Sequence, residues 1–97
     1  MRGRLIYIAG PMSGLPDLGR GAFNRAEMRL LGAGWKVLNP ACLPVGLPAK
    51  VYAPICLAML MQCEAIALLP GWEKSPGACM EHEVAMYQRM EIVMLEG

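Results

Sequence analysis

The stretch that decides the fold is EAIALLPGWEKSPGACMEHEVAMYQRMEIVML, residues 64–95. Its first six residues form an apolar run closed by a Pro-Gly pair, which is typical of a strand covered on both faces. The sequence Ser75-Pro76-Gly77 marks a helix start, because serine is a preferred N-cap and proline is favoured at the first helical position. We predict a helix over 76–90 and another strand over 91–95, which together make a strand–helix–strand unit.

The preceding chain has the same alternation of strand and helix. We predict strands over 4–10 and 35–40 and helices over 22–34 and 52–63. Gly34 is expected to end the first of these helices, and Pro54 fits the second only in its first turn. Two prolines and a glycine predict that residues 41–50 form a loop.

Strands that are apolar along their length and alternate with helices indicate a parallel sheet with helices on both faces. The predicted fold is a flavodoxin-like (Rossmann-like) three-layer α/β sandwich with four or five parallel strands. The 97 residues suffice for one modest hydrophobic core, so we predict a single domain over 1–97.

Composition narrows the classes of partner. A formal net charge of +1 provides no basic surface for polymeric nucleic acid. An apolar content of 56% is high for a small domain and predicts a homo-oligomer, a dimer or a tetramer. The apolar segment 51–71 resembles a membrane span, but it contains Pro54, Gln62 and Glu64, and a helix followed by a buried strand explains it better.

Four cysteines, at 42, 56, 63 and 79, have neither C-x-x-C spacing nor a spacing typical of zinc ligands. We predict reduced, mostly buried thiols, no metal, and a cytoplasmic location. The basic start Met1-Arg2-Gly3-Arg4 is followed by too short an apolar run for a signal peptide.

Three stretches lie at the carboxyl ends of predicted strands. They are Gly10-Pro11-Met12-Ser13-Gly14, then Asn39-Pro40, and then 70–77. Ligands of open parallel sheets bind outside the carboxyl ends of the strands, so we expect these stretches at one edge. The first is a tight turn or an anion cradle, and it lacks the Walker lysine and the G-x-G-x-x-G spacing of ATP and dinucleotide sites.

The third predicted helix carries the candidate chemistry. Ser75 as N-cap would leave the amides of Gly77 and Ala78 free to meet an anion. Glu81, about one turn along, either supports the helix and its neighbours or acts as a nucleophile toward a sugar carbon. Tyr7 is expected to be a core tyrosine, and it becomes a candidate catalytic partner only if its hydroxyl reaches Glu81.

Other conspicuous residues allow simpler interpretations. We expect His82 and Glu83 at the surface or in an interface, and Trp35 packed on the sheet. Trp72, in a strand-end loop, either packs or lies near a ligand. The methionines are mostly core residues.

Together these pieces resemble one known family. The chain is similar to the nucleoside 2-deoxyribosyltransferase superfamily in three stretches: IYIAGPMSG, the NP that ends the second strand, and CEAIALLPGWEKSPGACMEHEVA. The closest branch consists of small, largely uncharacterised members with a GPMSG loop and an LPGWE-x-S-x-GA-x-x-E signature. The related 2′-deoxynucleoside 5′-monophosphate N-glycosidases share the outline, and the resemblance covers about residues 4–95.

The resemblance implies a role for each matching residue. Glu81 would attack the anomeric carbon and hold the deoxyribosyl group, while Tyr7 would orient or assist it. Ser75 and the first-strand loop would bind the 5′ end of the sugar or a 5′-phosphate. The resemblance also implies no cofactor and sites completed by a neighbouring subunit.

One position departs from the family pattern. Active members carry an aspartate eight residues before the acidic residue that opens the third strand, and here that position is Cys56. The arginine of the same Y-x-R-x-D-L pattern is Pro54. A thiol is a poor substitute for a charge-assisted acceptor that positions the sugar.

The leading hypothesis from the sequence is cleavage or transfer at the N-glycosidic bond of a 2′-deoxynucleoside or its 5′-monophosphate, through a Glu81 glycosyl intermediate. The small size favours hydrolysis over transfer. The alternatives are a nucleotide-binding module that has lost turnover and an interface protein with a vestigial pocket.

Overall fold

Four parallel strands in the order β2-β1-β3-β4 form the centre of the computed structural model, which describes residues 4–12, 15 and 17–96. Their bounds are Leu5–Ala9 (β1), Lys36–Leu38 (β2), Ala65–Leu68 (β3) and Glu91–Met94 (β4). All four strands were predicted from the sequence, and each is shorter than the predicted strand. The parallel four-stranded sheet of the predicted fold is confirmed.

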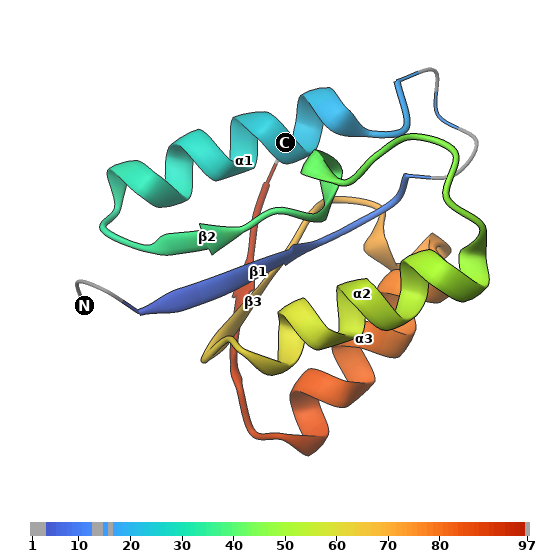
Figure 1. Cartoon of the computed structure of the whole chain (residues 1–97). Helices are drawn as coiled ribbons and strands as arrows, with labels where there is room; N and C mark the ends of the chain where they lie inside the picture. Colours follow the sequence, from blue (N-terminus) through green and yellow to red (C-terminus); the bar gives the residue numbers. More distant parts are fainter. Residues whose placement is uncertain (1–3, 13–14, 16, 97) are drawn as a thin grey trace.

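Helices cover both faces of the sheet (Figure 1). Helix α1 (Arg20–Gly32) lies on one face, where it packs on Ile6 and Ile8 of β1. Helices α2 (Ala49–Met61) and α3 (Pro76–Tyr87) lie on the other face, against Tyr7 and Ala9. Successive residues of β1 therefore point to opposite layers, and the three-layer, flavodoxin-like sandwich is confirmed.

Helix α1 begins two residues earlier than predicted. The Asp17 carboxylate accepts hydrogen bonds from the amides of Gly19 (3.0 Å) and Gly21 (2.9 Å), so the chain turns into the helix before residue 22. These two bonds also lower the pKa of Asp17. Gly34 follows the helix end with φ of 99°, as expected of a glycine stop.

Helix α2 begins at Ala49, three residues before its predicted start. The amides of Val51 and Tyr52 both bond to the Pro48 carbonyl, which extends the helix into the segment predicted as loop. The prediction that Pro54 lies in the first turn is therefore wrong. Pro54 lies in the second turn, where it has no N–H to donate to the carbonyl four residues earlier.

The apolar segment 51–71 is divided between α2 and β3. Within the described part of the chain, no helix has the length and apolar character needed to cross a membrane.

The cysteines correct one prediction. Only Cys56 is buried, while Cys63 and Cys79 are half-buried and Cys42 is exposed at the end of the short 3₁₀ helix Pro40–Cys42. All four are free thiols, and burial together with the nearby Glu64 raises the pKa of Cys63 to about 11.

The order of the strands determines where a ligand site lies. The chain passes from β1 through α1 to β2 on one side, and then through α2 to β3 on the other side of β1. The direction of winding thus reverses between β1 and β3, and such a reversal opens a crevice at the carboxyl ends of the two strands.

Candidate active site

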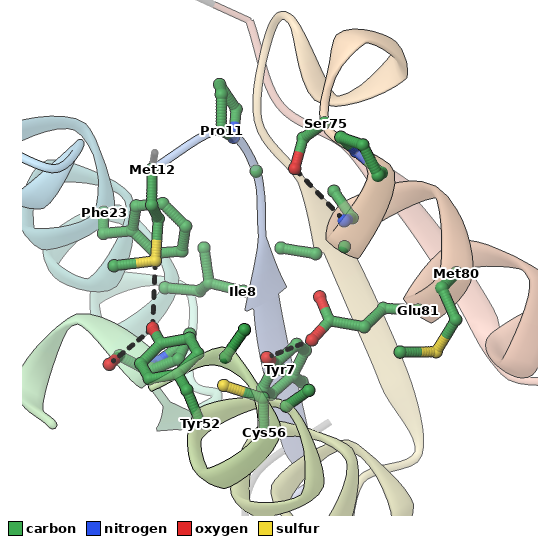
Figure 2. A pocket seen from close by; sticks show the side chains of 18 of the residues that line it. Tyr7, Ile8, Pro11, Met12, Phe23, Tyr52, Cys56, Ser75, Met80 and Glu81 are labelled. Carbon is green, nitrogen blue, oxygen red and sulfur yellow. Dashed lines mark hydrogen bonds between the residues drawn. The ribbon is translucent and has the colours of Figure 1, made fainter. Parts of the chain in front are cut away.

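A cleft of about 460 Å³ lies beyond the carboxyl ends of β1 and β3, within the usual range for small-molecule sites. Residues from β1 and the loop after it, α2 and the start of α3 form most of its walls (Figure 2). The predicted site residues that line it are Tyr7, Gly10, Pro11, Met12, Cys56, Ser75, Gly77, Ala78 and Glu81. The structure therefore brings together residues from three distant parts of the sequence.

The Tyr7 hydroxyl donates a hydrogen bond of 2.8 Å to Glu81 Oε2. Tyr7 is 1% exposed in the middle of the sheet and Glu81 is 9% exposed on α3, so the bond lies in a poorly hydrated place. The Tyr7 hydroxyl thus reaches Glu81, as is required of a candidate catalytic partner.

Burial raises the pKa of Glu81 from 4.5 to about 7, and the hydrogen bond from Tyr7 lowers it only in part. The Tyr7 hydrogen bond favours the ionised form of Glu81, but Glu81 lies in the second turn of α3, beyond the free amides of the helix start, which therefore do little to stabilise its charge. Near neutral pH, Glu81 is therefore present in both its ionised and its protonated form.

The groups beside Glu81 stay protonated. Burial and the nearby carboxylate raise the pKa of Tyr7 well above its ordinary value, so its hydroxyl is a permanent donor. Burial raises the pKa of Cys56 as well, although the neighbouring Tyr7 hydroxyl opposes this in part. Cys56 is consequently a neutral thiol, 2% exposed, at the floor of the cleft.

The start of α3 forms one wall of the cleft. Ser75 is its N-cap as predicted, and Ser75 Oγ accepts the Ala78 amide at 3.2 Å. The expectation that the Ala78 amide is free for an anion is therefore wrong. A Cβ added to Gly77 would meet no atom within 4 Å, so packing does not require glycine there. Because Gly77 has no side chain, it leaves room in the cleft.

The loop after β1 forms a second wall. A Cβ on Gly10 would lie 2.7 Å from Leu69 Cβ, so only glycine allows the end of β1 to approach the residue after β3 this closely. Pro11 and Met12 continue this wall. Ser13 and Gly14, which were predicted to complete it, lie outside the described residues.

Two predicted site residues do not line the cleft. Asn39 donates to Asn24 Oδ1 at 3.2 Å and Glu27 Oε1 at 2.8 Å, and accepts from the Ala41 amide at 2.9 Å. It therefore holds the end of β2 against α1, next to Pro40, which does line the cleft.

Trp72, the second of these residues, packs against His82 with ring centroids 4.5 Å apart and ring planes tilted by 41°. Both rings are half-buried, and Glu83 beside His82 is exposed, in agreement with the expected surface positions. Trp35 is half-buried against the core between the sheet and α1, with the Arg4 guanidinium 5.0 Å from its ring.

The cleft is also lined by residues that were not predicted as site residues, the most important being Tyr52, Lys74 and Met80. Tyr52 precedes Cys56 by four residues, so both occupy the same face of α2, and this spacing was a usable signal. Lys74 is exposed and lies just before the Ser75 cap.

The fold and this cleft define a flavodoxin-like α/β domain with a tyrosine–carboxylate pair at its topological switch point. The chain belongs to the family described as "Domain of unknown function (DUF4406)", whose model matches residues 4–94. No curated protein matches the chain.

Among solved structures, the chain is similar to a 2-desoxiribosyltransferase from Leishmania mexicana, with a TM-score of 0.73 and 25% sequence identity. The similarity covers 96% of this chain and 64% of the other. It supports the resemblance to the deoxyribosyltransferase superfamily. The assignment to the branch with the GPMSG loop stays a prediction.

Proposed function

We propose that the protein cleaves the N-glycosidic bond of a 2′-deoxynucleoside or its 5′-monophosphate, with Glu81 as the nucleophile. The observation that carries this proposal is the buried 2.8 Å hydrogen bond from Tyr7 to Glu81 at the floor of a strand-end cleft. The similarity in fold to a deoxyribosyltransferase supports the same chemistry.

In the proposed reaction, ionised Glu81 attacks the anomeric carbon, and the base leaves with the electrons of the broken carbon–nitrogen bond and takes up a proton. A covalent glycosyl ester to Glu81 results, as in retaining glycoside hydrolases. Water then hydrolyses the ester and releases the sugar. Tyr7 keeps the carboxylate oriented by donating its hydrogen bond throughout.

The remaining predicted residues take supporting roles in this proposal. Ser75, Gly77 and the loop from Gly10 to Met12 hold the 5′ end of the sugar, and the buried Ala78 supports Ser75 through its amide. Lys74, at the same wall, adds a positive charge that favours a 5′-phosphate. Cys56 faces the sugar beside Tyr7, while Asn39 and Trp72 act from behind the walls by supporting Pro40 and the start of α3.

The second candidate function is a nucleotide-binding module without turnover. The observation in its favour is Cys56, a neutral thiol where the resemblance implies an aspartate that positions the sugar.

We expect free base when the protein is incubated with 2′-deoxynucleosides and their 5′-monophosphates and the products are separated by chromatography. Stabilisation by a nucleotide with no base released from any substrate would support the binding module instead.

The pH dependence of cleavage gives a specific test of Tyr7. Only ionised Glu81 attacks, so kcat/KM should rise through pH 7 and level off above about pH 8. Tyr7→Phe removes the hydrogen bond that lowers the Glu81 pKa, so the midpoint should move about 1 pH unit higher. A midpoint that stays in place or moves lower in Tyr7→Phe contradicts this role.

We also propose that the protein is a homodimer that pairs through α2. The outward face of α2 consists of five exposed residues: Val51, Pro54, Ile55, Ala58 and Met61. Residues 51–63 contain no charged side chain, and the five residues of this face carry no polar side chain. A two-fold axis would place the same apolar stripe against itself, as isologous interfaces do. Ala53 of the same helix is exposed and lines the cleft, so the partner would lie beside the cleft mouth.

Sedimentation velocity should therefore give a mass twice that of the chain. Ala58→Glu places a charge at the centre of the stripe and should yield a folded monomer, because two like charges would meet across the axis. Met28→Glu, a matched change at an exposed methionine of α1, should remain dimeric. A monomeric parent protein, or a dimeric Ala58→Glu variant, would refute pairing through α2.

A further inference from the structure

The side chains of the cleft that carry an exchangeable proton bear on how a leaving base is protonated. When an N-glycosidic bond breaks, its electron pair goes to the base, so the base must take up a proton or be stable without one. A general acid that supplies this proton contributes about 10²- to 10⁴-fold to a rate. Among the described lining residues, six have a side chain with an exchangeable proton: Tyr7, Tyr52, Cys56, Lys74, Ser75 and Glu81.

Both tyrosine hydroxyls direct their proton to a protein acceptor. Tyr7 donates to Glu81 Oε2 at 2.8 Å, and the Tyr52 proton is shared between Met12 Sδ at 3.0 Å and the Pro40 carbonyl oxygen at 3.2 Å. Burial is the main cause that raises the pKa of both hydroxyls above the ordinary value. Each is therefore a weaker acid than a tyrosine in water, and its proton does not point to a ligand.

The thiol and the serine hydroxyl are also poor acids. Cys56 is 2% exposed, and burial raises the pKa of its thiol, so it stays neutral and is a weak hydrogen-bond donor. Ser75 Oγ caps α3 by accepting the Ala78 amide at 3.2 Å, and an aliphatic hydroxyl is less acidic than a phenol. Glu81 attacks in its ionised form and has no proton to give in that form.

Lys74 is the cationic residue of the described lining. It is exposed and precedes the Ser75 cap. Figure 2 shows Ser75 and Tyr52 on opposite sides of β1, so Lys74 belongs to the wall that the proposed function assigns to the 5′ end of the sugar. A hydrated ammonium group in this place is suited to pair with an anion. It is also the group whose role as an acid most needs a test.

The nucleophile, in contrast, is well placed. Glu81 is 9% exposed, lines the cleft, and is oriented by the hydrogen bond from Tyr7. Its buried carboxylate is more basic than a carboxylate in water, which favours bond formation to an electron-poor carbon. The described cleft thus favours attack on the sugar more than it favours protonation of the base that leaves.

We propose that the preferred substrates are 2′-deoxynucleosides whose base leaves without taking up a proton, in particular cationic purines alkylated at N7. This inference rests on the proposed function, because it concerns the leaving group of the Glu81 reaction. The Glu81 carboxylate forms a bond to the anomeric carbon while the bond from that carbon to N9 breaks. The electron pair moves onto N9 and cancels the positive charge of the alkylated ring, so a neutral base leaves. An unmodified purine leaves as an anion instead and takes its proton from water.

The test compares 7-methyl-2′-deoxyguanosine with 2′-deoxyguanosine, which differ by one methyl group and one charge. For each nucleoside, kcat/KM for base release by the parent protein is divided by the rate of spontaneous base loss in the same buffer. An enzyme without a general acid keeps the full sensitivity to the leaving group, so the two accelerations should agree within about tenfold. A general acid would raise the acceleration of 2′-deoxyguanosine alone, by about 10²-fold or more.

Three variants examine the individual protons. Removal of a general acid slows the substrate that needs the proton and spares the one that does not. Lys74→Met, Tyr52→Phe and Cys56→Ala should therefore each change kcat/KM by the same factor for both nucleosides. Glu81→Gln should abolish release of both bases. Tyr87→Phe, at a tyrosine of α3 that is 87% exposed, is the matched control for Tyr52→Phe and should change neither rate.

Two results would overturn this inference and leave the proposed function standing. They are an acceleration about 10²-fold larger for 2′-deoxyguanosine, or a loss of that size in one of the three variants that affects 2′-deoxyguanosine alone. The second result would also identify the acid. Failure of the proposed function has a different signature: no base is released from either nucleoside, or release continues unchanged in Glu81→Gln. Either of these outcomes refutes the Glu81 reaction and this inference with it.

Discussion

Glu81→Gln is expected to lower N-glycosidic cleavage by about 10⁴-fold or more, the order of loss seen when a catalytic nucleophile is removed. Glutamine has nearly the same shape and can accept the hydrogen bond that Tyr7 donates, so the cleft should keep its geometry. An amide cannot form the glycosyl ester, however. The measurement is base release per enzyme at saturating substrate, compared with nucleoside affinity by calorimetry.

The matched control is Glu83→Gln, which removes the same charge from an exposed position two residues along α3. It should cleave at the parent rate, because its carboxylate does not line the cleft. A Glu81→Gln protein that retains more than about a tenth of the parent activity would exclude Glu81 as the nucleophile. Loss of binding together with activity would instead indicate that the substitution disturbed the cleft.

The same substitution is expected to stabilise the fold at neutral and alkaline pH. The pKa of Glu81 is raised from 4.5 to about 7, so between these values the folded state binds more protons than the unfolded state. The contribution of Glu81 to the free energy of unfolding therefore falls as the pH rises from about 4.5 to 7, and it stays low at higher pH. Since one pKa unit corresponds to 1.36 kcal/mol, ionised Glu81 destabilises the fold by about 3 kcal/mol.

Urea unfolding of the parent and of Glu81→Gln at pH 5 and at pH 8 measures this effect. At each pH, the quantity of interest is the free energy of unfolding of the variant minus that of the parent. This difference should be about 2–3 kcal/mol larger at pH 8 than at pH 5. Glu83→Gln, which is exposed, should differ from the parent by less than about 0.5 kcal/mol at both values. An equal difference at the two pH values would show that Glu81 is not buried as the structure has it.

The strands and their parallel arrangement could be predicted because their apolar runs are short, continuous and closed by Gly, Pro or Asn. The helix starts were harder to predict. Asp17 and Pro48 extend α1 and α2 toward their N-termini through hydrogen bonds whose geometry the sequence does not display. Both errors moved a boundary by two or three residues and left the fold unchanged.

The site could be predicted where a residue follows a strand or caps a helix, as Gly10 and Ser75 do. The contact between Tyr7 and Glu81 was conceivable only as a condition, because 74 positions separate them. Asn39 and Trp72 contact neighbouring side chains, Glu27 and His82, instead of lining the cleft. These contacts depend on how separate elements pack, which the sequence does not show. Tyr52 occupies the tyrosine position of the Y-x-R-x-D-L pattern, but its contacts with Met12 and Pro40 could not be predicted, because these residues are distant in sequence.

The central position of β1 has a consequence for how the protein is made. Of the four strands described, β1 leaves the ribosome first, yet it pairs with β2 at residues 36–38 and with β3 only at 65–68. Until β3 arrives, an entirely apolar strand lacks half of its backbone partners, and a nascent chain in that state needs protection from aggregation. The Tyr7–Glu81 bond forms later still, so any cleavage activity would report that synthesis and folding have reached α3.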